Sequence, residues 1–115
     1  MRLPNADQAF VEDRKITTYL LSRSHRYGAA KCAFFESFGF RQDDWRRLRD
    51  ALLQHAADNQ VVSTLDTPFG RVFEVNGRLA SPDGRNPFVL VVWFFRPGEN
   101  RPRLVTAVPS RGQRP

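Results

Sequence analysis

Residues 88–95 read Phe-Val-Leu-Val-Val-Trp-Phe-Phe, and this run decides the fold. Every position is apolar, and most are β-branched or aromatic, which is typical of a β-strand. Because no polar side chain interrupts the run, it predicts a central strand that is buried on both faces. The remaining strands and helices must therefore pack around it.

Three further strands are predicted on either side of this run. Residues 71–79 alternate, with Phe73 and Val75 on one face and more polar side chains on the other. Residues 61–65 and 104–108 complete a four-stranded antiparallel β-meander. Glycine and proline mark the turns between these strands, at residues 67–70, 81–84 and 97–100.

Helical spacing of apolar residues dominates the first half of the chain. It predicts helices over residues 12–21 and 27–38, and a third that starts near Asp43 or Asp44 and fades at residues 57–59. Helices followed by a run of strands indicate an α+β fold, with about three N-terminal helices packed on the meander. We expect one domain over residues 1–109 and a flexible basic tail over residues 110–115.

The charge of the chain favours a polyanionic partner. Its 18 Lys and Arg residues outnumber its 12 Asp and Glu residues, giving a net charge of +6. Nucleic acid is the first candidate, and we expect RNA. No apolar run reaches the roughly 20 residues of a membrane helix, and the N-terminus lacks a signal-peptide core. With a single cysteine, Cys32, which we expect to be a small buried hydrophobe, these features predict a cytoplasmic protein.

One histidine and one lysine stand out among the cations. Only two of the 18 basic residues are lysines, Lys15 and Lys31, and Lys31 follows His25 by six residues. An ammonium group is a compact charge with rotatable donors, and histidine titrates near neutral pH. The two side chains can therefore form an acid–base or phosphate-handling pair at the start of one helix. The competing interpretation is a helix N-terminus with a solvated lysine.

The chain resembles a family of small uncharacterised bacterial proteins. The resemblance rests on His25, Gly28 and residues 31–35, Lys-Cys-Ala-Phe-Phe, and continues through residues 102–109, Pro-Arg-Leu-Val-Thr-Ala-Val-Pro. It departs from the family at Val108, where an aromatic residue is usual. Further matching stretches are residues 3–6, 39–40, 67–71, 83–85 and Trp93.

The layout is also similar to that of the barnase/EndoU/colicin/RelE-type ribonuclease toxins, which need no metal. This similarity implies that the ribose 2′-OH attacks its own phosphate, with His25 as general base or acid. It implies that Lys31 and Arg103 hold the phosphate and that Thr106 donates a hydrogen bond. Implied substrate-binding residues are Arg71, Arg85 and Trp93, with Trp93 stacking a base.

Geometry and residue type set conditions on these assignments. Arg103 and Thr106 have opposite parity on a regular strand, so a β-bulge is needed for both to face one site. The apolar run around Trp93 favours core packing over base stacking. His55, in the middle of a helix, is expected to be partly buried there.

Other chemistries lack the residues that they need. The chain has no glycine-rich phosphate loop and no His-x-x-x-His pair, and Asp43 with Asp44 fits a helix cap. We therefore expect no metal and no cofactor.

Two functions from different classes remain open. The first is a metal-independent ribonuclease of bacterial toxin type, restrained by a cognate antitoxin or immunity protein. The second is a non-catalytic basic module that binds RNA or a protein partner. The starting Met1 favours a standalone protein over a piece of a delivered toxin. The sequence does not determine the RNA target, the role as toxin or partner, or the oligomeric state.

Overall fold

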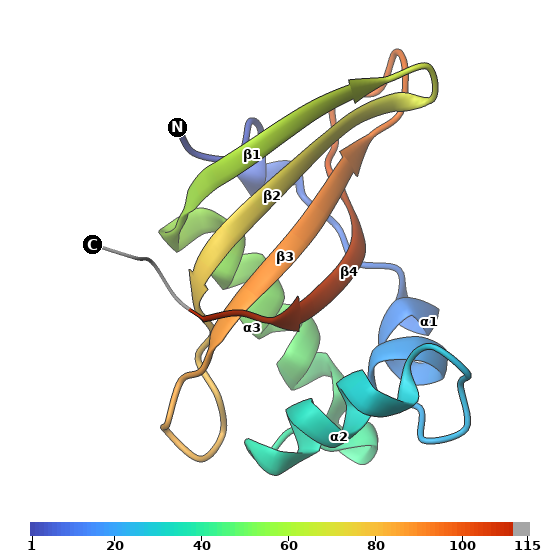
Figure 1. The fold of residues 1–115 in the computed structure, drawn as a ribbon, viewed down its shortest axis with the longest axis vertical. Coiled ribbons are helices and arrows are strands. Elements are labelled where there is room, and N and C mark those ends of the chain that lie inside the picture. The colour runs from blue at the N-terminus through green and yellow to red at the C-terminus, as the bar shows by residue number, and fades with distance from the viewer. Residues whose placement is uncertain (112–115) are drawn as a thin grey trace.

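The structure is a computed structural model that describes residues 1–111. One antiparallel sheet has the strand order β1-β2-β3-β4, the same as along the chain (Figure 1). The predicted meander is confirmed, and the run at residues 88–95 forms a central strand. The strands are β1 (Gln60–Thr67), β2 (Gly70–Arg78), β3 (Phe88–Phe95) and β4 (Arg103–Pro109).

Three helical segments precede the sheet, which confirms the α+β class. The first is a short α1 (Asp13–Lys15) that continues directly into a π-helical turn, η2 (Ile16–Leu20). The other two are α2 (Ala29–Ser37) and α3 (Trp45–Asp58). Two 3-10 turns add to them: η1 (Ala6–Gln8) and η3 (Gln42–Asp44).

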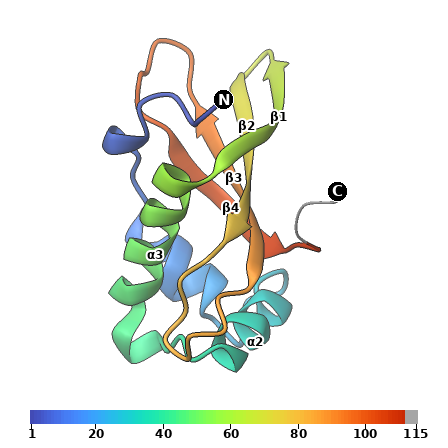
Figure 2. The same ribbon diagram turned by 90° about the vertical axis from the view of Figure 1, so that its left-hand side faces the viewer.

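The core lies between α3, η2 and one face of the sheet (Figure 2). Leu48 and Leu52 of α3 are fully buried against this face. Phe73 and Val75 of β2 are also buried, as their alternation predicts. Burial of an aliphatic or aromatic side chain of this size contributes roughly 1.5–3 kcal/mol, so these contacts hold the layers together.

The second face of β3 corrects the prediction that this strand is buried on both sides. Val89, Val91 and Trp93 have no exposed surface, whereas the alternate residues Phe88 and Leu90 are only half-buried, as are Val92 and Phe94. The face that carries the half-buried residues has no helix over it (Figure 2). Their side chains shield one another on the sheet without a covering layer.

His55 joins α3 to the two central strands. Its Nε2 lies 2.9 Å from the carbonyl oxygen of Val89 and 3.2 Å from that of Gly77. Because both partners are acceptors, Nε2 must carry the proton. Burial lowers the pKa of His55, so the ring is neutral inside the fold. His55 is thus a core residue of α3 and is more deeply buried than expected.

Both edge strands of the sheet contain a β-bulge. On β4, Val92 pairs with Thr106 and Trp93 pairs with Leu104, so Val105 is the extra residue. On β1, Val62 is left over in the same way. A bulge reverses the alternation of side chains along a strand, and the bulge at Val105 decides which residues of β4 share a face.

The C-terminal end of the described chain stays close to the sheet. The Ser110 amide donates a hydrogen bond to the carbonyl oxygen of Phe88 at 3.0 Å. Of the predicted tail at residues 110–115, residues 112–115 lie outside the described part of the chain.

Candidate functional site

A cleft of about 800 Å³ lies along the β4 edge of the sheet, where α1 and the loop after η2 approach β4. Four cationic side chains line it, against a single carboxylate, that of Glu12. Such a cleft attracts anions. Its lining residues are Glu12, Arg14, Lys15, Thr18, Tyr19, His25, Tyr27, Arg96, Arg103, Leu104, Val105 and Thr106.

The bulge at Val105 meets the condition that the sequence set for Arg103 and Thr106. With Val105 as the extra residue, Arg103 pairs with Phe94 and Thr106 pairs with Val92, both on the same side of β3. Arg103 and Thr106 therefore both line the cleft together with His25. Three of the four predicted catalytic residues converge on this cleft.

Tyr19, on η2, connects the helical side of the cleft to the sheet. Its hydroxyl lies 2.9 Å from Thr106 Oγ1, and the two groups share a hydrogen bond. Its ring meets the His25 ring edge-on, with 5.0 Å between centroids. The helical spacing of Tyr19 is typical of a core residue, and Tyr19 was therefore not predicted to belong to a site. Its half-buried position lets the ring pack while the hydroxyl reaches the cleft.

Both lysines of the chain lie beside Tyr19. Lys15 Nζ is 5.6 Å from the centre of the Tyr19 ring, and Lys31 Nζ is 5.5 Å from it. These distances permit cation–π attraction, which orients an ammonium group over the ring. Lys31 is not itself a lining residue, but it also donates to the carbonyl oxygen of Tyr27 at 3.2 Å. The rarity of lysine in the sequence therefore indicated a candidate site residue at Lys15 as well as at Lys31.

Backbone N–H donors determine which ring nitrogen of His25 carries the proton. His25 Nδ1 accepts hydrogen bonds from the amides of Tyr27 and Gly28, each at 3.0 Å. Since Nδ1 must keep its lone pair for these donors, the neutral ring carries its proton on Nε2. In this tautomer His25 donates a hydrogen bond through Nε2 and has no free nitrogen to accept a proton. Of the two predicted roles, general base or general acid, the geometry favours the one in which His25 donates.

Gly28 allows the His25 loop to approach Tyr19. A Cβ atom at this position would lie 2.1 Å from the carbonyl oxygen of Tyr19, far inside contact distance. Only glycine fits this approach without movement of the backbone. Gly28 therefore fixes the distance between the loop that carries His25 and the helical turn that carries Tyr19.

Arg103 is tied to two carboxylates at the end of the cleft. Its guanidinium lies 3.2 Å from Glu12 and 3.6 Å from Glu99, and 18% of the side chain is exposed. Its Nε is buried and makes no hydrogen bond to the described residues. An anion that enters the cleft must share this guanidinium with Glu12 and Glu99.

The three residues predicted to bind substrate do not line the cleft. Trp93 is fully buried in the core and offers no ring face to a base, so its predicted stacking role is not supported. Arg85 is held at the β2–β3 connection by Asp83, the Ser37 carbonyl oxygen and the Phe38 ring. Arg71 pairs with Asp66 at 2.6 Å and lines a neighbouring depression of about 450 Å³, which shares Arg96 with the cleft.

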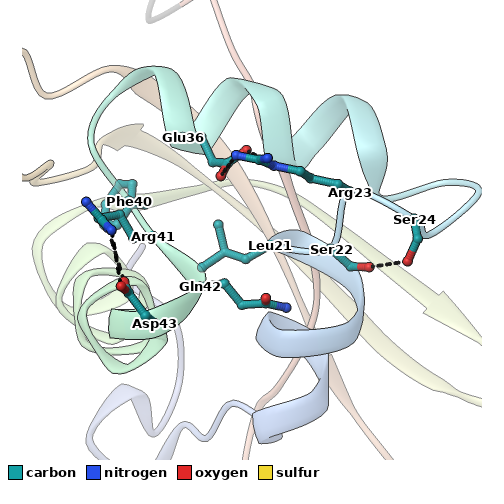
Figure 3. A pocket seen from close by; sticks show the side chains of 9 residues that line it. All are labelled: Leu21, Ser22, Arg23, Ser24, Glu36, Phe40, Arg41, Gln42 and Asp43. Atoms are coloured by element: carbon teal, nitrogen blue, oxygen red, sulfur yellow. Dashed lines mark hydrogen bonds and ion pairs between the residues drawn. The ribbon is translucent and has the colours of Figure 1, made fainter.

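A second pocket, of about 750 Å³, is lined in part by residues 21–24 of the loop that precedes His25 (Figure 3). Its charged side chains pair with each other: Arg23 with Glu36 at 2.9 Å and Arg41 with Asp43 at 3.1 Å. The bond to Arg23 lowers the pKa of Glu36. Cys32 lies behind Glu36, and burial raises the pKa of its thiol, which disfavours the reactive thiolate. This pocket leaves no charge unpaired for a ligand.

Among residues 1–111, no group of three or more His, Cys, Asp or Glu side chains is placed to hold a metal ion. Within the same part of the chain, no helix is both long and apolar enough to cross a membrane.

A solved structure shares the fold of this chain. It is a chain of the contact-dependent growth inhibition toxin–immunity protein complex from Klebsiella pneumoniae 342, with a TM-score of 0.74. The match covers 93% of this chain and 97% of the other, at 14% sequence identity. Identity this low shows a common fold and nothing further.

No curated protein matches the sequence. A family model, however, matches residues 2–111, which is nearly the whole chain. This extent agrees with a sequence resemblance that runs from residue 3 to residue 109. The chain belongs to the family described as a domain of unknown function, DUF6883.

Proposed function

We propose that this protein is a metal-independent endoribonuclease of bacterial toxin type and that the cleft beside β4 is its active site. One observation carries the proposal: the bulge at Val105 brings Arg103 and Thr106 to the cleft that His25 enters from a separate loop. A cationic cleft that also holds a carboxylate, an imidazole and the Tyr19–Thr106 hydroxyl pair has the groups that phosphodiester cleavage needs.

The proposed reaction is attack of the ribose 2′-oxygen on the adjacent phosphorus. The P–O5′ bond breaks, leaving a 2′,3′-cyclic phosphate and a free 5′-hydroxyl. Glu12 takes the proton from the 2′-hydroxyl, since it is the one carboxylate that lines the cleft. The Tyr19–Thr106 hydroxyl pair gives a proton to the leaving 5′-oxygen and regains one from water, while Glu12 returns its proton to water.

The remaining groups stabilise negative charge on the phosphorane. His25 donates through Nε2–H, because the backbone amides occupy its Nδ1. Lys15 and Arg103, which line the cleft, supply positive charge, and Lys31 adds to it from beside Tyr19. Fixed donors of this kind act without reorganisation during the reaction.

The toxin role and its setting are part of the same proposal. The fold is shared with a chain of a toxin–immunity protein complex, and the charge of +6 suits an RNA substrate better than it suits an RNA-mimicking inhibitor. We place its action in the cytoplasm, where RNA is abundant. Its expected partner is an acidic antitoxin or immunity protein that covers the cleft.

The test uses the purified chain on a mixture of tRNA and mRNA in the presence of EDTA. We expect cleavage products with 2′,3′-cyclic phosphate and 5′-hydroxyl ends. His25→Asn should slow cleavage roughly 100-fold, the cost of one transition-state donor. The side-chain oxygen of the asparagine can still accept hydrogen bonds from the amides of Tyr27 and Gly28, so the loop keeps its shape.

A matched control is Arg85→Ala, outside the cleft, which should cleave at the wild-type rate. Thr106→Val should be slow, because it removes the hydroxyl while keeping the shape of the side chain. Intact RNA with the wild-type chain, or equal rates for wild type and His25→Asn, would refute the proposal.

The second candidate is a non-catalytic RNA-binding module. One observation favours it: Glu12, the only carboxylate of the cleft, is already paired with Arg103. Such a module binds RNA with an affinity that falls steeply with salt and forms no product. Under this alternative, His25→Asn leaves the affinity unchanged.

A further inference from the structure

Exposed aromatic side chains are rare in the described part of the chain, and one of them lies at the cleft. Tyr27 is 64% exposed and Phe69 is 79% exposed. Phe69 lies in the β1–β2 turn, whereas Tyr27 lines the cleft two residues after His25. A large aromatic ring that is exposed to water beside a cationic cleft has an apolar face that a ligand can cover.

The exposure of Tyr27 does not come from a loose backbone. Its amide donates to His25 Nδ1 at 3.0 Å, and its carbonyl oxygen accepts from Lys31 Nζ at 3.2 Å. The following residue, Gly28, packs directly against the backbone of Tyr19. The backbone of Tyr27 is therefore fixed by the side chains of the site while its ring points into solvent.

Few groups contact the ring itself. The Arg26 guanidinium lies 5.3 Å from its centre, and the His25 ring is 6.3 Å away at a tilt of 55°. The Tyr27 hydroxyl makes no hydrogen bond to any described residue. Packing therefore does not explain why an aromatic residue occupies this position.

We propose that Tyr27 is a stacking platform for an unpaired nucleobase, and that the cleft takes single-stranded RNA. This inference rests on the proposed function of the cleft. A base stacks on an aromatic ring through its flat face, and that face is hidden in a duplex. The cations of the cleft hold the backbone phosphates beside it, which is the usual combination in single-strand binding. Tyr27 thus takes the role that the sequence assigned to Trp93.

The experiment measures equilibrium binding, so its result does not depend on cleavage. A fluorescent eight-nucleotide 2′-O-methyl RNA, which cannot be cleaved by 2′-attack, is titrated as a single strand and as a duplex. We expect tighter binding of the single strand. Tyr27→Ala should weaken that binding roughly 5- to 100-fold, the range for one base–aromatic stack.

Two variants separate stacking from other causes. Tyr27→Phe keeps the ring and should bind within about twofold of wild type, since stacking needs no hydroxyl. Phe69→Ala removes an exposed ring that does not line the cleft and should have no effect. The Tyr27 hydrogen bonds use backbone atoms only, so Tyr27→Ala leaves the positions of His25 and Lys31 intact.

The outcomes are distinct from those of the cleavage test. Binding of the single strand that Tyr27→Ala weakens supports the inference even if wild type cleaves no RNA. Equal affinity of Tyr27→Ala and wild type overturns it, even if RNA is cleaved. Preference of wild type for the duplex, or no binding of the single strand, also overturns it.

Discussion

The two edges of the sheet carry the same irregularity and have different surroundings. Each edge strand has one β-bulge, at Val62 on β1 and at Val105 on β4. Beside β4, the segment of residues 12–25 supplies Glu12, Tyr19 and His25 to a cleft. Beside β1, Val62 and Leu65 are 53% and 61% exposed. A bulge positions functional groups only where other elements of the fold meet it.

The edges also differ in how their side chains are held. On β4, Thr106 bonds to Tyr19 and Arg103 bonds to Glu12, contacts across 87 and 91 residues of sequence. On β1, Asp66 bonds to Arg71 on the adjacent strand, five residues away. Long-range side-chain contacts hold β4 to the N-terminal segments. The start of β1 is held by backbone contacts with Met1 and Arg2, and the rest of the strand by its hairpin with β2.

Truncation of one leucine on each edge strand gives the largest expected contrast between the edges. Leu104 of β4 is 2% exposed and packs in the core, whereas Leu65 of β1 is 61% exposed. We expect Leu104→Ala to lose about 3 kcal/mol in the free energy of unfolding, as for a large core truncation. Leu65→Ala should cost much less. Urea unfolding measures both, and equal losses would contradict the comparison.

Gly28→Ala tests the close approach that builds the β4 side. The added Cβ would meet the Tyr19 carbonyl oxygen at 2.1 Å, so the loop has to move. We expect a loss of about 1–3 kcal/mol in the free energy of unfolding, the usual range for overpacking, and thermal unfolding measures it. The neighbouring exposed position offers the control Ala29→Ser, which should change little. A stable Gly28→Ala protein with an unchanged His25 NMR spectrum would show that the approach is not needed.

Lowering the pH should reduce the free energy of unfolding through His55, which contacts the two central strands between the edges. The native pKa of His55 is lowered by burial, so below its ordinary value of 6.5 the unfolded chain binds the proton first. The stabilisation is complete above pH 6.5 and is lost as the pH falls towards the native pKa. The loss is at most about 1.4 kcal/mol per pH unit. Denaturant unfolding from pH 7.5 to 5 measures it, and His55→Gln should flatten this part of the profile.

The smallest contrast concerns two arginines, Arg103 of the edge strand β4 and Arg71, which pairs with the edge strand β1 from β2. Arg71 is 58% exposed and its partner Asp66 is 74% exposed, so Arg71→Ala should leave stability unchanged within error. Arg103 is 18% exposed and packs against Phe10 as well as pairing with two carboxylates. Arg103→Ala should cost about 1 kcal/mol, through lost packing and lost pairing. Equal effects on the melting temperature would remove this difference between the edges.

The sequence predicted most of the sheet because its signals there are local. Alternation located Phe73 and Val75 on the buried face, and the apolar run at residues 88–95 matched β3 at both ends. The prediction that β3 is buried on both faces was wrong. An apolar pattern shows which side chains can be buried, but it does not show whether a second layer covers them.

The site was predictable in part, and the missing part depends on tertiary contacts. The sequence could state that Arg103 and Thr106 need a bulge to share a face, but the bulge itself depends on how β4 pairs with β3. Tyr19 was missed because helical spacing does not separate a core position from one at the border between helix and sheet. Trp93 was assigned a ligand by resemblance, and its burial shows why residue type without exposure is a weak guide.

The position of the two lysines has a consequence for chemical labelling. Lys15 and Lys31 are the only residues with an ε-amino group, and both lie within 5.6 Å of the centre of one tyrosine ring. Any reagent that modifies lysine side chains therefore places its labels beside Tyr19, which lines the cleft. A fluorophore, a cross-linker or an isotopic methyl group attached in this way would report on whatever enters there, with no engineered cysteine.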